Sequence, residues 1–190
     1  MIPRELYMQR IRPFIGNELI KILTGMRRSG KSVMLDLIKD ELQGQGISDD
    51  NFISFNFESL ANTKFCNARA LYEELSRRIA SISGKSYLFF DEIQEVTDWE
   101  RCINSARVDF NCDIYITGSN AHLLSTELAT YLGGRYTEFV IYPFSFQEYL
   151  IGRKQAATRI DPAKEFHSYL ELGGMPFLIN LHEARAASLQ

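Results

Sequence analysis

Short apolar runs alternate along the chain with longer segments in which apolar residues recur every three or four positions. The runs at 19–23, 87–90 and 113–117 are almost continuously apolar, which is typical of parallel strands buried on both faces. The pattern predicts strands at 19–23, 52–57, 87–90, 113–117 and 137–142, and helices at 33–42, 68–82, 99–108, 123–132, 146–151 and 163–172.

Strand and helix signals alternate, which predicts an α/β fold with a parallel sheet covered by helices on both faces. Ligands of such sheets bind at the carboxyl ends of the strands. We expect three parts: an N-terminal helical arm at 1–18, a nucleotide-binding core at 19–149, and at 150–190 the truncated start of a helical lid or C-terminal region.

One loop between a predicted strand and a predicted helix matches the pattern G-x-x-x-x-G-K-[ST] in full. Such loops hold phosphate groups with backbone N–H groups and with the positive end of the following helix. Lys31 would reach the β- and γ-phosphates, and the Ser32 hydroxyl would face Mg²⁺. The alternative is a glycine-rich turn capped by Ser29. The expected nucleotide-binding residues are Gly25, Met26, Arg27, Arg28, Ser29, Gly30, Lys31, Ser32 and Val33, of which the two arginines are expected to be solvated or structural.

Two adjacent carboxylates, Asp91 and Glu92, follow the apolar strand at 87–90. Two acids at the end of a buried strand are costly unless a cation satisfies them. We therefore expect Asp91 to hold Mg²⁺ through water and Glu92 to act as the base that polarises an attacking water. Such pairs also cap helices, which is the alternative interpretation.

Further polar residues follow the other predicted elements. Asn120, after the strand at 113–117, is expected to orient water against the γ-phosphate, or else to cap the next helix. Asn56 or Glu58 would hydrogen-bond Glu92 and hold it inactive, unless they only form a turn. Arg135 would act as an arginine finger for an adjacent subunit, or else pair with a helix C-terminus.

Composition limits the classes of function. The chain is 45% hydrophobic and 24% charged with a net charge of −3, as in globular proteins, yet residues 1–35 hold seven basic and two acidic side chains. This local positive charge favours a small anionic ligand over nucleic acid, or is simply a solvated face. Neither a membrane span nor a signal peptide is evident. The chain has three cysteines, and their spacing is not that of a zinc site: Cys66, Cys102 and Cys112. An odd number of cysteines without such spacing leads us to expect a reducing, cytoplasmic location.

Several segments together resemble the prokaryotic AAA-domain ATPases whose C-terminal half is a conserved domain of unknown function. They are G-M-R-R-S-G-K-S, L-F-F-D-E-I-Q, I-Y-I-T-G-S-N, G-G-R-Y before V-I-Y-P-F-S-F-Q-E-Y-L, and G-G-M-P. The likeness runs from Arg4 to Pro176, and members of this family are roughly twice this length.

The resemblance implies five parallel strands, with the acidic strand separated from the loop strand by the strand at 113–117. It also implies ATP and Mg²⁺ as ligands. Lys31 and Ser32 correspond to the loop roles, Asp91 and Glu92 to the acidic roles, Asn120 to the sensor and Arg135 to a finger.

Three functions compete at this point. The first is a Mg²⁺-dependent ATPase that drives a conformational or assembly change in an unknown protein partner or in a homo-oligomer joined through Arg135. The second is a nucleotide-gated binding module, and the third is a small-molecule kinase. Glu92 favours activation of water over transfer to a small molecule. No N-K-x-D guanine signature is present. The sequence of this chain does not indicate nucleic acid as a partner, and we expect such a partner only for parts that the chain lacks.

Overall fold

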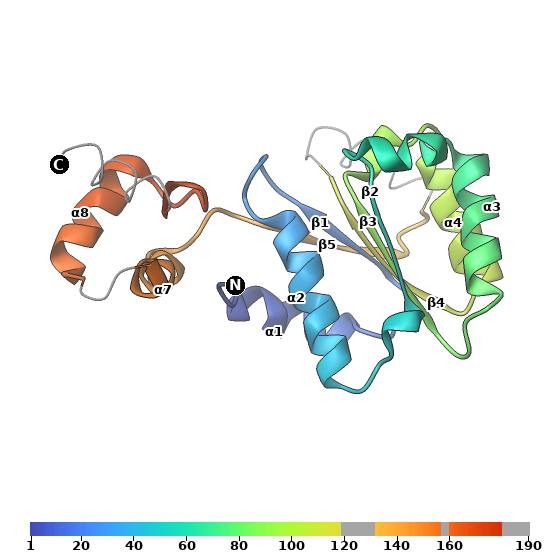
Figure 1. Ribbon diagram of the computed structural model, residues 1–190, viewed down its shortest axis with the longest axis horizontal. Helices are drawn as coiled ribbons and strands as arrows, with labels where there is room; N and C mark the ends of the chain where they lie inside the picture. The colour runs from blue at the N-terminus through green and yellow to red at the C-terminus, as the bar shows by residue number, and fades with distance from the viewer. Residues whose placement is uncertain (119–131, 157–159, 180–190) are drawn as a thin grey trace.

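The computed structural model describes residues 1–118, 132–156 and 160–179. Five parallel strands form one sheet in the order β2-β3-β4-β1-β5 (Figure 1). This confirms the α/β fold and the five parallel strands, with β4 between the loop strand β1 and the acidic strand β3. The strands are β1 (Ile20–Thr24), β2 (Phe52–Asn56), β3 (Ser86–Asp91), β4 (Cys112–Thr117) and β5 (Tyr136–Val140).

Helices cover both faces of the sheet, as expected, with α1 and α2 on one face and α3 and α4 on the other (Figure 1). The α-helices are α1 (Glu5–Ile11), α2 (Lys31–Gly44), α3 (Ala68–Ile79), α4 (Trp99–Asp109), α7 (Phe146–Ala156) and α8 (Pro162–Leu172). The short 3-10 helices are η1 (Arg12–Phe14), η2 (Asp49–Asn51), η3 (Leu60–Phe65) and η4 (Ile93–Glu95). The helix expected at 123–132 lies almost wholly outside the described residues.

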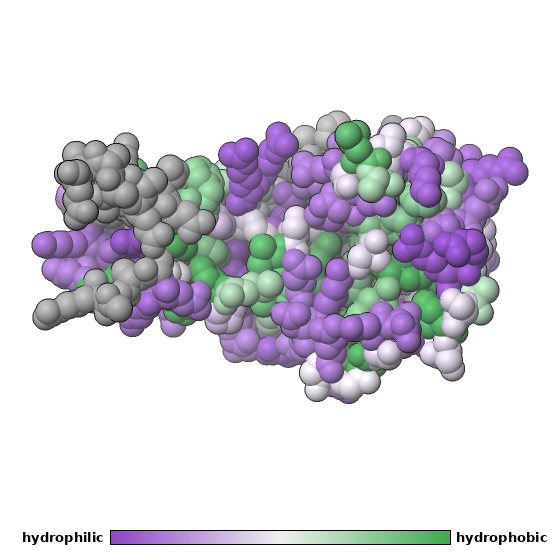
Figure 2. All heavy atoms as spheres, viewed as in Figure 1, coloured by the Kyte–Doolittle hydropathy of each residue, from purple (hydrophilic) through white to green (hydrophobic). Residues whose placement is uncertain are grey.

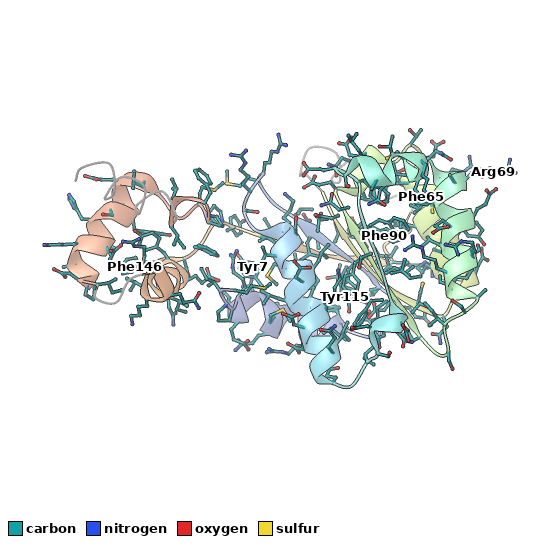
Figure 3. All side chains as sticks on the ribbon, in the orientation of Figure 1. Tyr7, Phe65, Arg69, Phe90, Tyr115 and Phe146 are labelled. Carbon is teal, nitrogen blue, oxygen red and sulfur yellow. The ribbon has the colours of Figure 1, made fainter. Side chains whose placement is uncertain are left out.

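Alternation along the strands divides the core into two layers. Phe90 packs on the α3–α4 side with Phe55 and Phe65, whereas Phe89 and Tyr115 pack on the α1–α2 side (Figure 3). Successive side chains of a strand point to opposite faces, and here both faces are apolar. This is why the strands carry nearly continuous apolar runs.

Helices α7 and α8 extend to one side of the sheet (Figure 1) and have a small apolar core of their own. Phe144, Tyr149 and Ile179 are buried there, and Ile2 from the N-terminal segment packs against them. A backbone contact closes this unit, since the Phe144 N–H donates to the Gly174 carbonyl at 2.7 Å. A Cβ at Gly174 would lie 2.1 Å from the Phe144 carbonyl oxygen, so only glycine permits this approach.

Two further features are the polarity of the surface and the state of the cysteine thiols. Hydrophilic residues cover most of the face seen in Figure 2. Within the described ranges, no helix is both long and apolar enough to cross a membrane. The three cysteines are free thiols, and burial raises the pKa of Cys102 and of Cys112 to about 12. Neither thiol is therefore set up as a nucleophile at neutral pH.

Candidate functional site

The glycine-rich loop joins the carboxyl end of β1 to the first residue of α2. Gly25 and Gly30 have φ angles of 141° and 101°, which side chains other than glycine rarely adopt. A Cβ at Gly25 would lie 2.2 Å from the carbonyl oxygen of Ile141, so the loop lies directly against the chain that leaves β5. Lys31 and Ser32 form the first turn of α2. This helix therefore begins before the apolar spacing at 33–42 becomes visible.

The Lys31 side chain is only 4% exposed and has few close partners. Its Nζ lies 3.3 Å from the carbonyl oxygens of both Gly25 and Met26, and 3.6 Å from Oε1 of Glu92. These distances are long for the bonds of an ammonium group, which are shorter than 3 Å when strong. Lys31 therefore joins the loop to the acidic strand end with spare capacity to donate.

Three neighbouring strand ends hold the carboxylate of Asp91, which is 7% exposed. Its Oδ1 accepts from the Thr117 hydroxyl at 2.5 Å, and its Oδ2 accepts from the Asn56 amide at 3.3 Å. The same Thr117 oxygen accepts from the Glu92 backbone N–H at 3.0 Å. Because β2, β3 and β4 are adjacent and parallel, their last residues meet at one edge, as the sequence predicted.

Glu92 lies just beyond β3 with a left-handed backbone, at φ 54°. Its Oε2 accepts from the Gln94 amide at 2.6 Å, and its Oε1 is the oxygen that faces Lys31. Such a conformation costs a non-glycine residue about 1–3 kcal/mol and is common where a site holds a side chain in place. The turn directs the carboxylate toward the loop.

The predicted bond from Asn56 or Glu58 to Glu92 is wrong. The sheet register pairs Asn56 with Asp91, so the amide meets that carboxylate instead. Glu58 makes a long, exposed ion pair with Arg27 at 3.4 Å, and its N–H donates to Asn56 Oδ1. Gln94, two residues along from Glu92, is the partner that the sequence reasoning missed.

Two cavities flank the loop. One, of about 350 Å³, is lined by Ser32, Asn56 and Asp91 and therefore brings together both residues expected at the metal. Within the described ranges no three His, Cys, Asp or Glu side chains cluster. The Ser32 hydroxyl and the Asp91 carboxylate suit a cation with few protein ligands and several bound waters, and Mg²⁺ usually binds in this way.

The second cavity, of about 390 Å³, lies between the loop and the α7–α8 unit. Gly30 and Val33 form one wall, and the N-terminal residues Met1, Ile2 and Arg4 form another. The lining from the α7–α8 side is Phe144, Gly152, Gln155, Pro176 and Ile179. This cavity is mostly apolar and opens beside the first turn of α2.

The remaining predicted residues lie elsewhere. Asn120 lies outside the described residues. Arg135 is exposed and immediately precedes β5, where its carbonyl accepts from the first residue of β1. It is therefore at the amino edge of the sheet, opposite the loop, and takes no part in this chain's own site. Arg27 is exposed, and the Arg28 guanidinium lies 5.9 Å from the centre of the Phe177 ring.

The fold and the site together define a P-loop nucleotide-binding domain. The family model of the AAA domain matches residues 17–150, and the chain belongs to that family. It is 42% identical over 183 residues to an uncharacterized protein of Haemophilus influenzae, covering 96% of this chain and 46% of the relative. It is 35% identical over 167 residues to an uncharacterized protein of Methanocaldococcus jannaschii, covering 83% of this chain and 35% of the relative.

Among solved structures, a DNA replication initiation factor superposes with a TM-score of 0.61 at 15% identity. The match covers 97% of this chain and 59% of that structure. At this identity the likeness shows the fold alone. The chain spans less than half the length of the two curated relatives.

Proposed function

We propose that this chain binds ATP with Mg²⁺ and hydrolyses the γ-phosphate, and that hydrolysis drives a conformational or assembly change. One observation carries the proposal. Lys31 joins the phosphate loop to an acidic strand end, where Asp91 and Glu92 are held in separate, well-defined positions.

The loop suits a chain of phosphates. Its glycines bring the backbone close, and the first N–H groups of α2 have no partner within the helix. The buried Ser29 hydroxyl has no hydrogen-bond partner among the described residues, which leaves it able to serve a ligand or a water. Lys31 would turn from its two long carbonyl contacts to the β- and γ-phosphate oxygens.

Ser32 and Asp91 would hold Mg²⁺, the serine directly and the aspartate through water. The bound cation would neutralise charge that builds up on the phosphate oxygens. Asn56 and Thr117 support this role, since each donates to a different oxygen of Asp91 and so orients the carboxylate.

Glu92 would accept the proton of the attacking water. Its bond to Gln94 fixes one carboxylate oxygen, and its separation from Lys31 leaves the other facing the loop. We propose that Asn120 contacts the γ-phosphate or this water. Arg135 would serve the site of a neighbouring subunit, since it lies at the edge of the sheet away from this chain's own loop.

The adenine ring would occupy the cavity of about 390 Å³ between Val33 and the α7–α8 unit. This assignment gives residues 150–190 the role of a lid and the N-terminal residues that of a wall. We further propose that the ATPase serves an unknown protein partner and that the longer relatives carry the domain through which it acts.

A nucleotide-gated binding module remains the second candidate, and one observation favours it. The Glu92 carboxylate faces the side chains of both Lys31 and Gln94. ATP hydrolysis would therefore be slow until a partner releases Glu92 from these two side chains. Nucleotide would then report a state rather than drive one.

Two substitutions test the proposal. Glu92→Gln should keep ATP binding but lower turnover by about 10²–10³, the usual cost of removing a key electrostatic group. Lys31→Ala should lower ATP affinity about a hundredfold or more. Equilibrium binding of a fluorescent ATP analogue and single-turnover phosphate release measure the two effects separately.

Arg10→Met is a matched control, because Arg10 is exposed in the last turn of α1. Wild-type turnover in Glu92→Gln would remove Glu92 as the base. Binding without turnover in the wild type would favour the nucleotide-gated module. Repeating the assay on the full-length relative, with and without DNA, would decide whether nucleic acid belongs among the partners.

A further inference from the structure

Arg4 is a buried arginine that contacts three separate parts of the molecule. Its side chain is 2% exposed, and each of its three kinds of nitrogen donates a hydrogen bond. Nη1 donates to the Ser29 carbonyl at 3.1 Å, Nη2 to the Tyr142 carbonyl at 2.7 Å, and Nε to Glu148 at 2.8 Å. The phosphate loop, the chain leaving β5 and the helix α7 thus meet on one guanidinium group.

The bond to Ser29 fixes a peptide of the phosphate loop. In a trans peptide the carbonyl and the next N–H point in opposite directions. With its oxygen held by Arg4, the Ser29–Gly30 peptide directs the Gly30 N–H away from Arg4. Gly30 is the residue before Lys31, so this N–H belongs to the set that would face phosphate.

The bond to Glu148 ties the same group to the first turn of α7. The second carboxylate oxygen of Glu148 accepts from the backbone N–H and the hydroxyl of Ser145, at 2.8 and 2.9 Å. Glu148 therefore closes the start of the helix with one oxygen and holds Arg4 with the other. A shift of α7 would pull on the guanidinium and, through it, on the loop.

Neighbouring residues of the N-terminal segment strengthen this connection. Ile2 packs so closely on α7 that a Cβ at Gly152 would lie 2.7 Å from its Cδ1. The Tyr7 hydroxyl accepts from the Tyr142 N–H at 3.0 Å, while Tyr7 itself is buried against the main core. The segment thus has one end in the α7–α8 core and the other in the sheet domain, with Arg4 between them.

We propose that Arg4 is a positioning residue of the nucleotide site, which couples the order of the phosphate loop to the docking of α7. The coupling rests on the proposed nucleotide binding. Nucleotide that orders the loop strengthens the attachment of α7, and by linkage a docked α7 strengthens nucleotide binding by the same factor.

The test uses ADP as the probe, with two readouts on each variant: affinity for ADP, and hydrogen exchange of the α7 amides with and without ADP. In the wild type, ADP should slow exchange in α7. Arg4→Met should weaken ADP binding about tenfold or more, as expected for a lost hydrogen bond from a charged group, and should abolish the slowing. Arg10→Met, on the exposed face of α1, should change neither.

Two further variants keep the test decisive if Arg4→Met folds poorly. Arg4→Lys retains the charge but offers a single point donor, so it should keep part of the affinity and lose most of the α7 response. Glu148→Gln leaves the Ser29 contact in place, so it should weaken the α7 response more than the ADP affinity. Exchange of the β3 amides serves as the stability reference and should not change in either variant.

The outcomes separate this inference from the proposed function. A wild type that does not bind ADP overturns the nucleotide proposal itself. A wild type that binds ADP without a change in α7 overturns the coupling, as does an Arg4→Met variant that keeps the ADP-dependent slowing. Equal loss of protection in β3 and α7 would assign Arg4 a structural role only.

Discussion

Two buried lysines, one within the loop strand β1 and one at the start of α2, have opposite surroundings. Lys21, near the start of the strand, has no exposed side-chain surface and pairs with Asp113. It also contacts the Leu19 carbonyl at 2.9 Å and both oxygens of Asn17 at 3.3 Å. Among the residues that the structure describes, Lys31, after the loop, has two carbonyl contacts at 3.3 Å and a carboxylate at 3.6 Å.

The difference separates a structural charge, Lys21, from the charge that we propose to bind phosphate, Lys31. A buried ammonium is costly unless it is paired and hydrogen-bonded, and Lys21 meets both conditions. Its partner Asp113 is satisfied in turn by the Tyr115 hydroxyl and the Gly16 N–H. Lys31 lacks such a set of partners, which is the arrangement expected of a lysine that waits for an anionic ligand.

The largest expected effect comes from Lys21→Met. The substitution leaves Asp113 buried without its cation, which typically costs about 3–5 kcal/mol of unfolding free energy. Urea unfolding followed by circular dichroism measures the loss. Adding Asp113→Leu to the same chain should recover part of the loss, because no unpaired charge remains buried. The recovery is incomplete because the Tyr115 hydroxyl and the Gly16 N–H lose their acceptor. A loss below about 1 kcal/mol would mean that the Lys21–Asp113 pair contributes no more to the free energy of unfolding than an exposed ion pair does.

The same substitution at the other lysine, Lys31→Met, should act on binding instead of folding. We expect ADP affinity to fall about a hundredfold, equivalent to about 2.7 kcal/mol, while the urea midpoint hardly changes. Isothermal titration with ADP and the same urea experiment measure the two quantities. The contrast between the lysines fails if Lys31→Met unfolds the protein as readily as Lys21→Met, or if ADP binds it with wild-type affinity.

The contrast also marks how far the sequence could lead. Apolar runs and their spacing predict all five strands, because strands depend on local patterns. The resemblance supplies the order of three of them, with β4 between β1 and β3. The loop motif and the Asp91–Glu92 pair are local as well. Ion pairs between distant segments could not be predicted from local patterns. Arg4 and Glu148 are 144 positions apart in the sequence, and Lys21 and Asp113 are 92 positions apart.

Errors at the site have the same origin. The sequence predicts that Asn56 lies at the acidic edge, but the partner of Asn56 depends on the register between β2 and β3, which pairs it with Asp91. The left-handed turn after Asp91 then directs the Glu92 side chain toward Gln94 instead of Asn56. A sequence indicates which residues gather at a strand edge, whereas the hydrogen-bond partners follow from register and backbone angle.

The smallest expected effect concerns the hydroxyl that completes the Lys21 cluster. Tyr115 donates to Asp113 at 2.8 Å and is fully buried. Tyr115→Phe removes this donor and keeps the ring, so it should cost about 1 kcal/mol of unfolding free energy at pH 8. Urea unfolding of the wild type and the variant under identical conditions measures the difference.

The pH dependence of that difference has a definite sign. Burial, and next the charge of Asp113, raises the pKa of Tyr115 well above its ordinary value of 10.0. The folded protein therefore keeps this proton at a pH where the unfolded chain releases it, and the wild type loses stability as the pH rises above 10. The phenylalanine variant has no such proton to release, so the gap between the two proteins should shrink from pH 8 to pH 11. A gap that stays constant over this range would show that the hydroxyl ionises as readily in the folded protein as in the unfolded chain, and that the cluster around Lys21 is open to water.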